Sequence, residues 1–290
     1  MNYNLSTLTD VRKLFRERLR HLYPVNETDA IASLIIRTIL NTDRLQELMN
    51  PSLAVPPAKG RKILKICDEL SAGKPVQYIL GETEFYGCRL KVNRYTLIPR
   101  RETEELTDLV IKENRAFGGM VLDIGTGPGT IAIPVALNIP DCNVHALDFS
   151  ETILKTAREN AVLNKAQVFF YRADILNPGW KPPAKYGIII SNPPYVPENE
   201  RKNMHINVTK YEPAGALFVP DDDPLMFYRA IVRQGGELML PGAKIYFEIH
   251  EMMGDAIKNL LTGEGFSNIR IIKDLNGRDR IVTCTYHDKQ

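Results

Sequence analysis

Short apolar segments alternate with amphipathic segments through most of the sequence after residue 100. The apolar segments lie at 120–124, 143–148, 167–171, 187–191 and 244–249. Short apolar strands separated by amphipathic helices imply parallel crossover connections. A last segment, 266–286, is typical of two strands with a turn at Asn276 and Gly277, which would form a hairpin at one edge of the sheet. The sequence therefore predicts an α/β fold with a doubly wound sheet.

The first quarter of the chain has a helical pattern. Apolar residues recur there at helical spacing in three stripes, and Thr7 and Asp10 are placed as a capping pair before the first stripe. Residues 76–92 are instead rich in Tyr, Phe, Val and Ile around Gly81 and Gly87, which favours an extended hairpin. We expect a small helical domain over 1–75, a linker β-hairpin over 76–96 and the α/β domain over 97–290.

Composition limits the partners and the compartment. The 37 Lys and Arg residues nearly balance the 35 Asp and Glu residues, so any nucleic-acid contact would have to be local. No apolar stretch approaches the ~20 residues that cross a bilayer, and no secretory signal is expected at the N-terminus. The four cysteines form no C-x-x-C pair and the five histidines show no ligand spacing, which argues against disulfides and against a metal site. We therefore expect a cytoplasmic protein with no metal and no membrane contact.

A glycine-rich turn follows the first strand of the α/β region. The segment VLDIGTGPG, residues 121–129, would let the backbone approach a ligand beyond the carboxyl end of a strand. A dinucleotide-binding turn would place its third glycine at Thr130, so this spacing disfavours a pyrophosphate cradle. Asp148 ends the next strand, where its carboxylate can accept two hydrogen bonds from a ribose diol. Asp174 follows the third strand and could accept from an adenine amino group; a helix cap or solvated turn is an equal alternative.

The segment SNPPY, residues 191–195, follows the fourth strand. Pro193 and Pro194 remove two amide donors and leave carbonyl acceptors. A planar NH2 group has two donors, so the Asn192 side-chain oxygen and the Pro193 carbonyl could hold both hydrogens and direct the lone pair toward an electrophile. Tyr195 offers an aromatic face against which a flat amide or base could lie. Taken alone, the segment could equally be an ordinary proline turn.

The two turns together predict group transfer from a nucleoside-like donor to an NH2 nitrogen, and S-adenosylmethionine fits as the donor. Three alternatives remain open. An adenine amino methyltransferase acting on nucleic acid would use the same donor, and the basic segment 12–20 supports it. A binding module that has lost turnover is the second. A nicotinamide oxidoreductase is the third, although the glycine spacing and the NPPY turn disfavour it.

In this order, DIGTGPG, Asp148 and NPPY resemble class I methyltransferases, which are Rossmann-like enzymes, that act on planar NH2 groups. Four further segments resemble the HemK/PrmC family of peptide chain release factor glutamine methyltransferases: GKPVQYILGETEFYG (73–87), LIPRRETEEL (97–106), YEPAGALF (211–218) and DLNGRDRIV (274–282). The resemblance covers nearly the whole chain. It implies methylation, by S-adenosylmethionine, of the side-chain amide nitrogen of the glutamine in the Gly-Gly-Gln loop of class I release factors. The substrate would be a protein, recognised in part by the N-terminal helices.

The resemblance also assigns residues to the site. It implies that the cofactor is bound by Gly125, Thr126, Gly127, Pro128, Gly129, Asp148 and Asn192, and by Asp174 and Ile175 near the adenine. It implies substrate binding by Asn192, Pro193, Pro194 and Tyr195, of which Asn192, Pro193 and Tyr195 would be catalytic. The chain departs from the family pattern at Arg101, where proline is usual, and at His250, where glycine is usual. We assign neither of these two residues a catalytic role.

Overall fold

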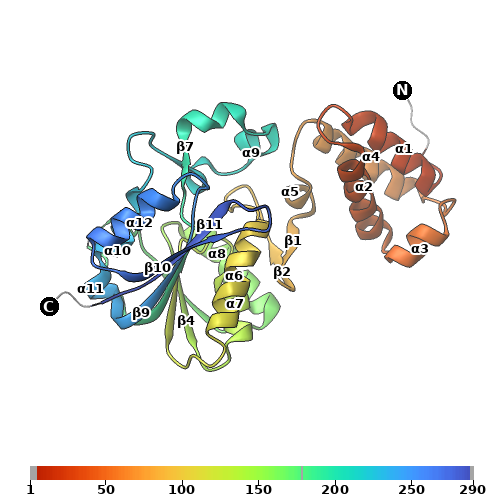
Figure 1. Cartoon of the computed structure of the whole chain (residues 1–290). Coiled ribbons are helices and arrows are strands. Elements are labelled where there is room, and N and C mark those ends of the chain that lie inside the picture. Colours follow the sequence, from red (N-terminus) through yellow and green to blue (C-terminus); the bar gives the residue numbers. More distant parts are fainter. Residues whose placement is uncertain (1–4, 178, 288–290) are drawn as a thin grey trace. The chain divides into compact units, whose positions relative to one another are not determined.

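The computed structural model describes residues 5–177 and 179–287 (Figure 1). The chain divides into two compact units, Met1–Leu80 and Gly81–Gln290. This division falls inside the segment 76–96 that we expected to be a linker. In the described ranges, no helix is both long enough and apolar enough to cross a membrane.

The first unit is helical, as predicted. Its helices are α1 (Leu8–Leu19), α2 (Val25–Leu40), α3 (Arg44–Met49), α4 (Pro57–Ser71) and α5 (Val76–Leu80). The predicted cap is present: the Thr7 hydroxyl accepts from the Asp10 backbone amide, and the Asp10 carboxylate accepts from the Thr7 amide. The apolar stripes of α1, α2 and α4 meet in one core, in which Phe15, Ile35 and Ile63 are fully buried.

Helix α5 corrects one prediction. We predicted extended structure from Val76, but Val76–Leu80 is one helical turn, which begins as the Pro75 carbonyl accepts from the amides of Tyr78 and Ile79. Val76, Ile79 and Leu80 are three and four residues apart, and they pack against the core of the first unit. Helical spacing therefore prevailed here over a β-prone composition.

The hairpin itself begins later and packs on the second unit. Strands β1 (Glu82–Phe85) and β2 (Cys88–Lys91) pair antiparallel. The backbone amide of Lys91 donates to Asn160 Oδ1 at 2.7 Å, and that of Arg89 donates to Asn164 Oδ1 at 3.1 Å. Both asparagines lie on α8 (Glu151–Asn164), so helix α8 fixes the position of β2.

The second unit contains a seven-stranded sheet with strand order β10-β11-β9-β6-β3-β4-β5. The strands are β3 (Met120–Ile124), β4 (Asn143–Asp148), β5 (Val168–Arg172), β6 (Tyr186–Ser191), β9 (Met239–Glu248), β10 (Ser267–Lys273) and β11 (Asp279–Thr285). The five strands from β9 to β5 are parallel, and the β10–β11 hairpin is antiparallel at one edge. The predicted sheet, including the terminal hairpin, is confirmed.

Helices cover both faces of this sheet. Along β6, Ile188 and Ile190 pack with α6 (Arg101–Glu113) and α7 (Ala132–Asn138). Ile189, between them, packs with α10 (Met226–Arg233) and α12 (Gly254–Gly263) on the other face. The alternation of side chains along a strand thus produces two cores.

The segment between β6 and α10 contains short elements. They are β7 (Val196–Pro197), η1 (Glu198–Asn203), α9 (Ile206–Tyr211), η2 (Ala214–Ala216) and β8 (Phe218–Val219), and α11 (Gly235–Leu238) follows α10. Strands β7 and β8 pair in parallel and so hold together the two ends of the segment 196–219. Because β4 and β6 flank β3 on opposite sides, the strand order reverses at β3, where ligands of open α/β sheets bind.

Candidate active site

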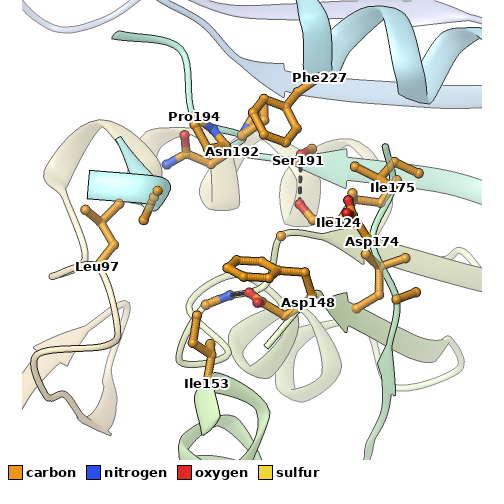
Figure 2. Close-up of a pocket in the computed structure, with 18 of the residues that line it drawn as sticks. Leu97, Ile124, Asp148, Ile153, Asp174, Ile175, Ser191, Asn192, Pro194 and Phe227 are labelled. Atoms are coloured by element: carbon orange, nitrogen blue, oxygen red, sulfur yellow. Dashed lines mark hydrogen bonds between the residues drawn. The ribbon is translucent and has the colours of Figure 1, made fainter. Parts of the chain in front are cut away.

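A pocket opens at the carboxyl ends of β3, β4 and β6 (Figure 2). Eight of the residues predicted from the sequence line it: Gly125, Gly127, Asp148, Asp174, Ile175, Asn192, Pro193 and Pro194. Figure 2 shows Asp148 and Ile153 on one side of the pocket and Asn192 and Pro194 on the other. The two turns that the sequence analysis singled out therefore border one space.

The three glycines of the first turn serve two purposes. All have φ between +57° and +86°, where side chains are strained. A Cβ atom at Gly125 or Gly127 would meet no protein atom within 4 Å, so these backbone segments border open space. A Cβ atom at Gly129 would lie 2.7 Å from Ile133 Cδ1. Gly129 therefore permits close packing of α7 and does not line the pocket.

Thr126 and Pro128 lie outside the pocket lining and brace the turn. The Thr126 hydroxyl donates to Asp123 Oδ2 at 2.6 Å, and the same oxygen accepts from the Ala132 amide at 3.1 Å. The Pro128 carbonyl accepts from Asn160 Nδ2 at 2.9 Å. Asp123 is completely buried, and this burial raises the pKa of its carboxyl to about 7. Sequence reasoning missed Asp123, whose only signal was a carboxylate inside a buried strand.

Asp148 presents a buried carboxylate at the end of β4. One oxygen accepts from the Gly127 amide at 3.1 Å and the other from the Ser150 amide at 3.2 Å. Each oxygen keeps acceptor capacity, because a carboxylate offers about four lone-pair sites. The residue is only 5% exposed, and burial raises the pKa of Asp148 to about 6.

Asp174 and Ile175 lie on the side of the pocket next to β5. Asp174 is exposed and accepts from the Leu176 amide at 3.0 Å, so it is a turn residue that also lines the pocket. Ile175 is buried, and its carbonyl accepts from Gln234 Nε2 at 2.8 Å. Phe227, from α10, continues this apolar wall.

Residues 191–194 form a turn that we call the proline corner. Ser191 connects it to the sheet, and Asn192 connects it to helix α6. The Ser191 hydroxyl donates to the Ile124 carbonyl at 2.7 Å and so joins the ends of β6 and β3. Asn192 Nδ2 donates to Thr103 Oγ1 at 3.0 Å, which turns the Asn192 side-chain oxygen away from Thr103. Pro193 is buried and Pro194 half-buried, and both line the pocket.

Tyr195 lies outside the pocket lining. Its hydroxyl donates to Glu248 Oε1 at 3.0 Å, and burial, reinforced by this carboxylate, keeps the pKa of the phenol far above its usual value. Its ring meets His250 edge-on, with 6.2 Å between the ring centroids. Tyr195 is therefore not among the predicted site residues that line the pocket.

Comparison with known proteins matches both units. Residues 10–81 match the family model described as the PrmC N-terminal domain, and residues 102–211 match the methyltransferase small domain. The release factor glutamine methyltransferase of Bacteroides thetaiotaomicron is 43% identical over 93% of this chain and 96% of that protein. That of Flavobacterium psychrophilum is 37% identical over 96% of this chain and 99% of that protein. The chain belongs to the release factor glutamine methyltransferase family.

Among solved structures, a methyltransferase from Pyrococcus furiosus has a TM-score of 0.50 and 19% identity to this chain. The match covers 70% of this chain and 90% of the other, and at this identity it shows the fold alone. Together with the family assignment it confirms the predicted Rossmann-like class I methyltransferase fold. The resemblance stated from the sequence is confirmed as well.

Two segments that carried the family resemblance meet at a buried carboxylate. Glu212, from the segment 211–218, accepts from the Ile98 amide at 3.2 Å and pairs with the Arg100 guanidinium. Both partners belong to the segment 97–106. Each segment contributes residues to the pocket lining, so Glu212 holds two parts of the wall together.

The two positions that depart from the family pattern lie outside the pocket lining. Arg101 is exposed at the first turn of α6. His250 Nδ1 accepts from the Met252 amide at 3.2 Å, which leaves Nε2 to donate to Glu200 at 3.3 Å. Because Glu200 lies on η1, His250 connects that helix to the end of β9.

Sequence reasoning missed most of the apolar wall of this methyltransferase pocket. The missed lining residues are Tyr95, Leu97, Ile124, Leu147, Phe149, Ile153, Ala173, Ser191, Gly215, Ala216, Phe227 and Ile231. They come from separate segments with no common spacing. Phe149 offered a usable signal, because it is an aromatic residue that directly follows Asp148 in the sequence.

Proposed function

We propose that this protein transfers the methyl group of S-adenosylmethionine to the side-chain amide nitrogen of the glutamine in the Gly-Gly-Gln loop of class I peptide chain release factors. The observation that carries the proposal is that one pocket is bordered by Asp148 and the glycine turn on one side and by Asn192 and Pro193 on the other. The names of the curated relatives support the choice of substrate.

The residues present fit the cofactor. The open backbone at Gly125 and Gly127 leaves space for a ligand, and Asp148 retains acceptors for two ribose hydroxyls. Ile153 and Ile175 supply apolar contacts of the kind that bind an adenosine. The bound cofactor supplies a methyl group that is activated on a sulfonium.

The proline corner acts on the acceptor amide. Asn192 Oδ1 and the Pro193 carbonyl accept from the two N–H bonds of the glutamine NH2 group, which directs the nitrogen lone pair away from them. An amide nitrogen is a poor nucleophile because its lone pair is delocalised. Acceptors fixed before the reaction favour the pyramidal nitrogen that develops during attack.

The helical first unit would recognise the rest of the release factor, since a side chain in a narrow pocket needs recognition elsewhere. We place the protein in the cytoplasm, and its four free cysteines agree with a reducing compartment.

Adenine amino methylation of nucleic acid is the weaker proposal. Its support was the basic segment 12–20, in which Arg12, Arg16 and Arg18 each pair with a carboxylate within the first unit. Pairing three of its five basic residues reduces the positive charge that this segment offers to phosphates.

The test is to incubate the protein with methyl-labelled S-adenosylmethionine and, in separate reactions, a class I release factor, RNA or DNA. We expect label on the loop glutamine and none on a release factor whose loop glutamine is replaced by alanine. Label on RNA or DNA, or equal label on both release factors, would contradict the proposal.

A further inference from the structure

We propose that Thr103 and Glu248 are positioning residues that fix the carboxamide of Asn192 in the orientation needed to accept from the substrate NH2 group. This inference rests on the proposed function, because it concerns the same acceptor site. Neither residue lines the pocket, so both act through Asn192.

The three side chains form one hydrogen-bonded chain. Asn192 Nδ2 donates to Thr103 Oγ1 at 3.0 Å, and the Thr103 hydroxyl donates to Glu248 Oε2 at 2.7 Å. Thr103 is 2% exposed and Glu248 is 0% exposed, so the bond between them is shielded from water, whereas the Asn192–Thr103 bond is part-buried because Asn192 lines the pocket.

The direction of each bond follows from its neighbour. A carboxylate only accepts, so the single hydroxyl hydrogen of Thr103 is used by Glu248. The Thr103 oxygen can then only accept, and the group that faces it must be the NH2 of Asn192. Rotating the carboxamide by half a turn would place two oxygens with lone pairs against each other. The chain therefore keeps Asn192 Oδ1 available to the substrate.

The same carboxylate holds the other end of the NPPY turn. Glu248 Oε1 accepts from the Tyr195 hydroxyl at 3.0 Å. The Glu248 carbonyl accepts from the Tyr228 hydroxyl at 2.8 Å, which fixes the end of β9. One buried residue thus restrains both Asn192 and Tyr195, and this gives Tyr195 a role that does not need contact with the substrate.

Both oxygens of Glu248 must accept a hydrogen bond, one from Thr103 and one from Tyr195, so this arrangement requires the ionised carboxylate. Burial raises the pKa of this carboxyl, while the Thr103 and Tyr195 hydroxyls and the charge of Arg280 oppose that rise and Glu102 adds to it. A buried carboxylate costs free energy of folding. Here the ionised carboxylate fixes which group donates and which accepts in the hydrogen bonds that link Glu248, Thr103 and Asn192.

The experiment compares Thr103→Val, which removes only the hydroxyl, with Thr103→Ser, which keeps it. Thr107→Val is the matched control, because Thr107 is also buried and lies one turn along α6. Its hydroxyl donates to the Thr103 backbone carbonyl and takes no part in the side-chain bonds that link Asn192, Thr103 and Glu248. We expect Thr103→Val to lower kcat for the release factor about tenfold, because a modest misplacement of a reacting group costs one to two orders of magnitude. Thr103→Ser should recover most of the loss, and S-adenosylmethionine affinity should change less than about twofold. Wild-type kcat in Thr103→Val, or no recovery in Thr103→Ser, would overturn the proposal.

Glu248→Gln gives a second test that separates orientation from folding. A glutamine can accept at only one oxygen, so one of the two hydroxyls loses its acceptor. We expect kcat, measured well below the thermal midpoint where the variant is folded, to fall about tenfold, whereas the midpoint itself should drop modestly, because one buried hydroxyl is left without an acceptor. Unchanged kcat in a folded Glu248→Gln protein would overturn the proposal.

A spectroscopic measurement is independent of turnover. In the nitrogen-15 spectrum of the ligand-free protein, the Asn192 side-chain NH2 signals, assigned by their loss in Asn192→Ala, should exchange slowly with water. Exchange should be faster in Thr103→Val and unchanged in Thr107→Val. Equal exchange in all three proteins would refute the inference, even if the release factor is not the substrate. Absence of transfer by the wild-type protein, with slow exchange retained, would instead refute the proposed function alone.

Discussion

The two sides of the pocket are built over different sequence distances. On the cofactor side, Asp148 bonds to the Gly127 amide 21 residues earlier, within one β–α–β unit. On the acceptor side, Asn192 bonds to Thr103 across 89 residues, and Thr103 bonds to Glu248 across 145. The first side uses backbone amides and glycines, and the second uses side chains from three distant elements.

This difference leads us to expect that one side of the pocket determines cofactor affinity and the other determines kcat. Backbone groups at the end of β3 are fixed by the sheet and can hold the cofactor before the substrate arrives. In the proposed function, the acceptor side depends on the orientation of the Asn192 carboxamide, which matters most when the amide nitrogen changes geometry. We therefore expect substitutions on the cofactor side to change cofactor affinity and substitutions on the acceptor side to change kcat.

The largest effect is expected for Asn192→Ala. It removes one of the two proposed acceptors for the substrate NH2 group, and loss of a comparable preorganised contact costs about 10²- to 10³-fold in kcat. S-adenosylmethionine affinity should change far less. Single-turnover transfer and calorimetry measure the two quantities. A variant with the wild-type rate would remove the distinction between the two sides.

Asp148→Ala should show the opposite pattern. It removes the proposed acceptor for the ribose hydroxyls, and the net loss of one hydrogen bond to a charged group, about 1.5–3 kcal/mol, should weaken cofactor affinity about 10- to 100-fold, because the second hydroxyl can bond to water. At saturating cofactor, kcat should stay within a few-fold of wild type. Calorimetric titration checks the affinity. If kcat fell and cofactor affinity did not, Asp148 would act like a residue of the acceptor side.

The unequal sequence distances also explain what could be predicted from the sequence. Gly125, Gly127 and Asp148 were found because a buried strand, a turn and a second strand lie close together in the chain. Asn192 and Pro193 were found because their chemistry is contained in four adjacent residues. The sheet was predicted for the same reason, since each strand carries its own apolar pattern.

Thr103, Glu212 and Glu248 could not be found in this way. Their partners are distant in sequence, and an isolated Glu at the end of a strand or in a loop carries no local signal. Glu248 lies beside β6 only because β9 is its parallel neighbour. For Tyr195, the sequence predicted an aromatic face for the substrate but not the hydrogen bond to Glu248, because that partner lies 53 residues away.

Cofactor binding should weaken in acid. Burial raises the pKa of Asp148 to about 6, and ribose hydroxyls donate to its ionised form, so the ligand favours the deprotonated residue. As pH falls from 7 to 5, Asp148 takes up a proton that must be lost on binding, and affinity should decrease about tenfold, since one pKa unit equals a tenfold change.

Asp148→Asn is the control for this dependence. It should bind weakly at both pH values with a much flatter profile. Any dependence that it retains near pH 7 would come from Asp123, whose buried carboxyl has its pKa raised to about 7. An unchanged affinity between pH 5 and pH 7 in the wild type would show that Asp148 does not receive the ribose.

The smallest effect is expected for Glu212→Gln, which tests whether the acceptor side depends on long-range contacts beyond Asn192. The glutamine can still accept from the Ile98 amide or from Arg100, but it loses the charge that satisfies both. We expect the KM for the release factor to rise about threefold, with kcat within twofold of wild type. The free energy of unfolding should fall by about 1–2 kcal/mol, because a buried charge-assisted bond is lost.

Glu198→Gln is the matched control for Glu212→Gln. Glu198 pairs with Arg201 where both side chains are about half exposed, and such pairs contribute little. Steady-state kinetics and urea unfolding of the two variants isolate the buried pair. If Glu212→Gln behaved like Glu198→Gln, the segments 97–106 and 211–218 would hold their positions without the carboxylate. The acceptor side would then not need the long-range contact made by Glu212.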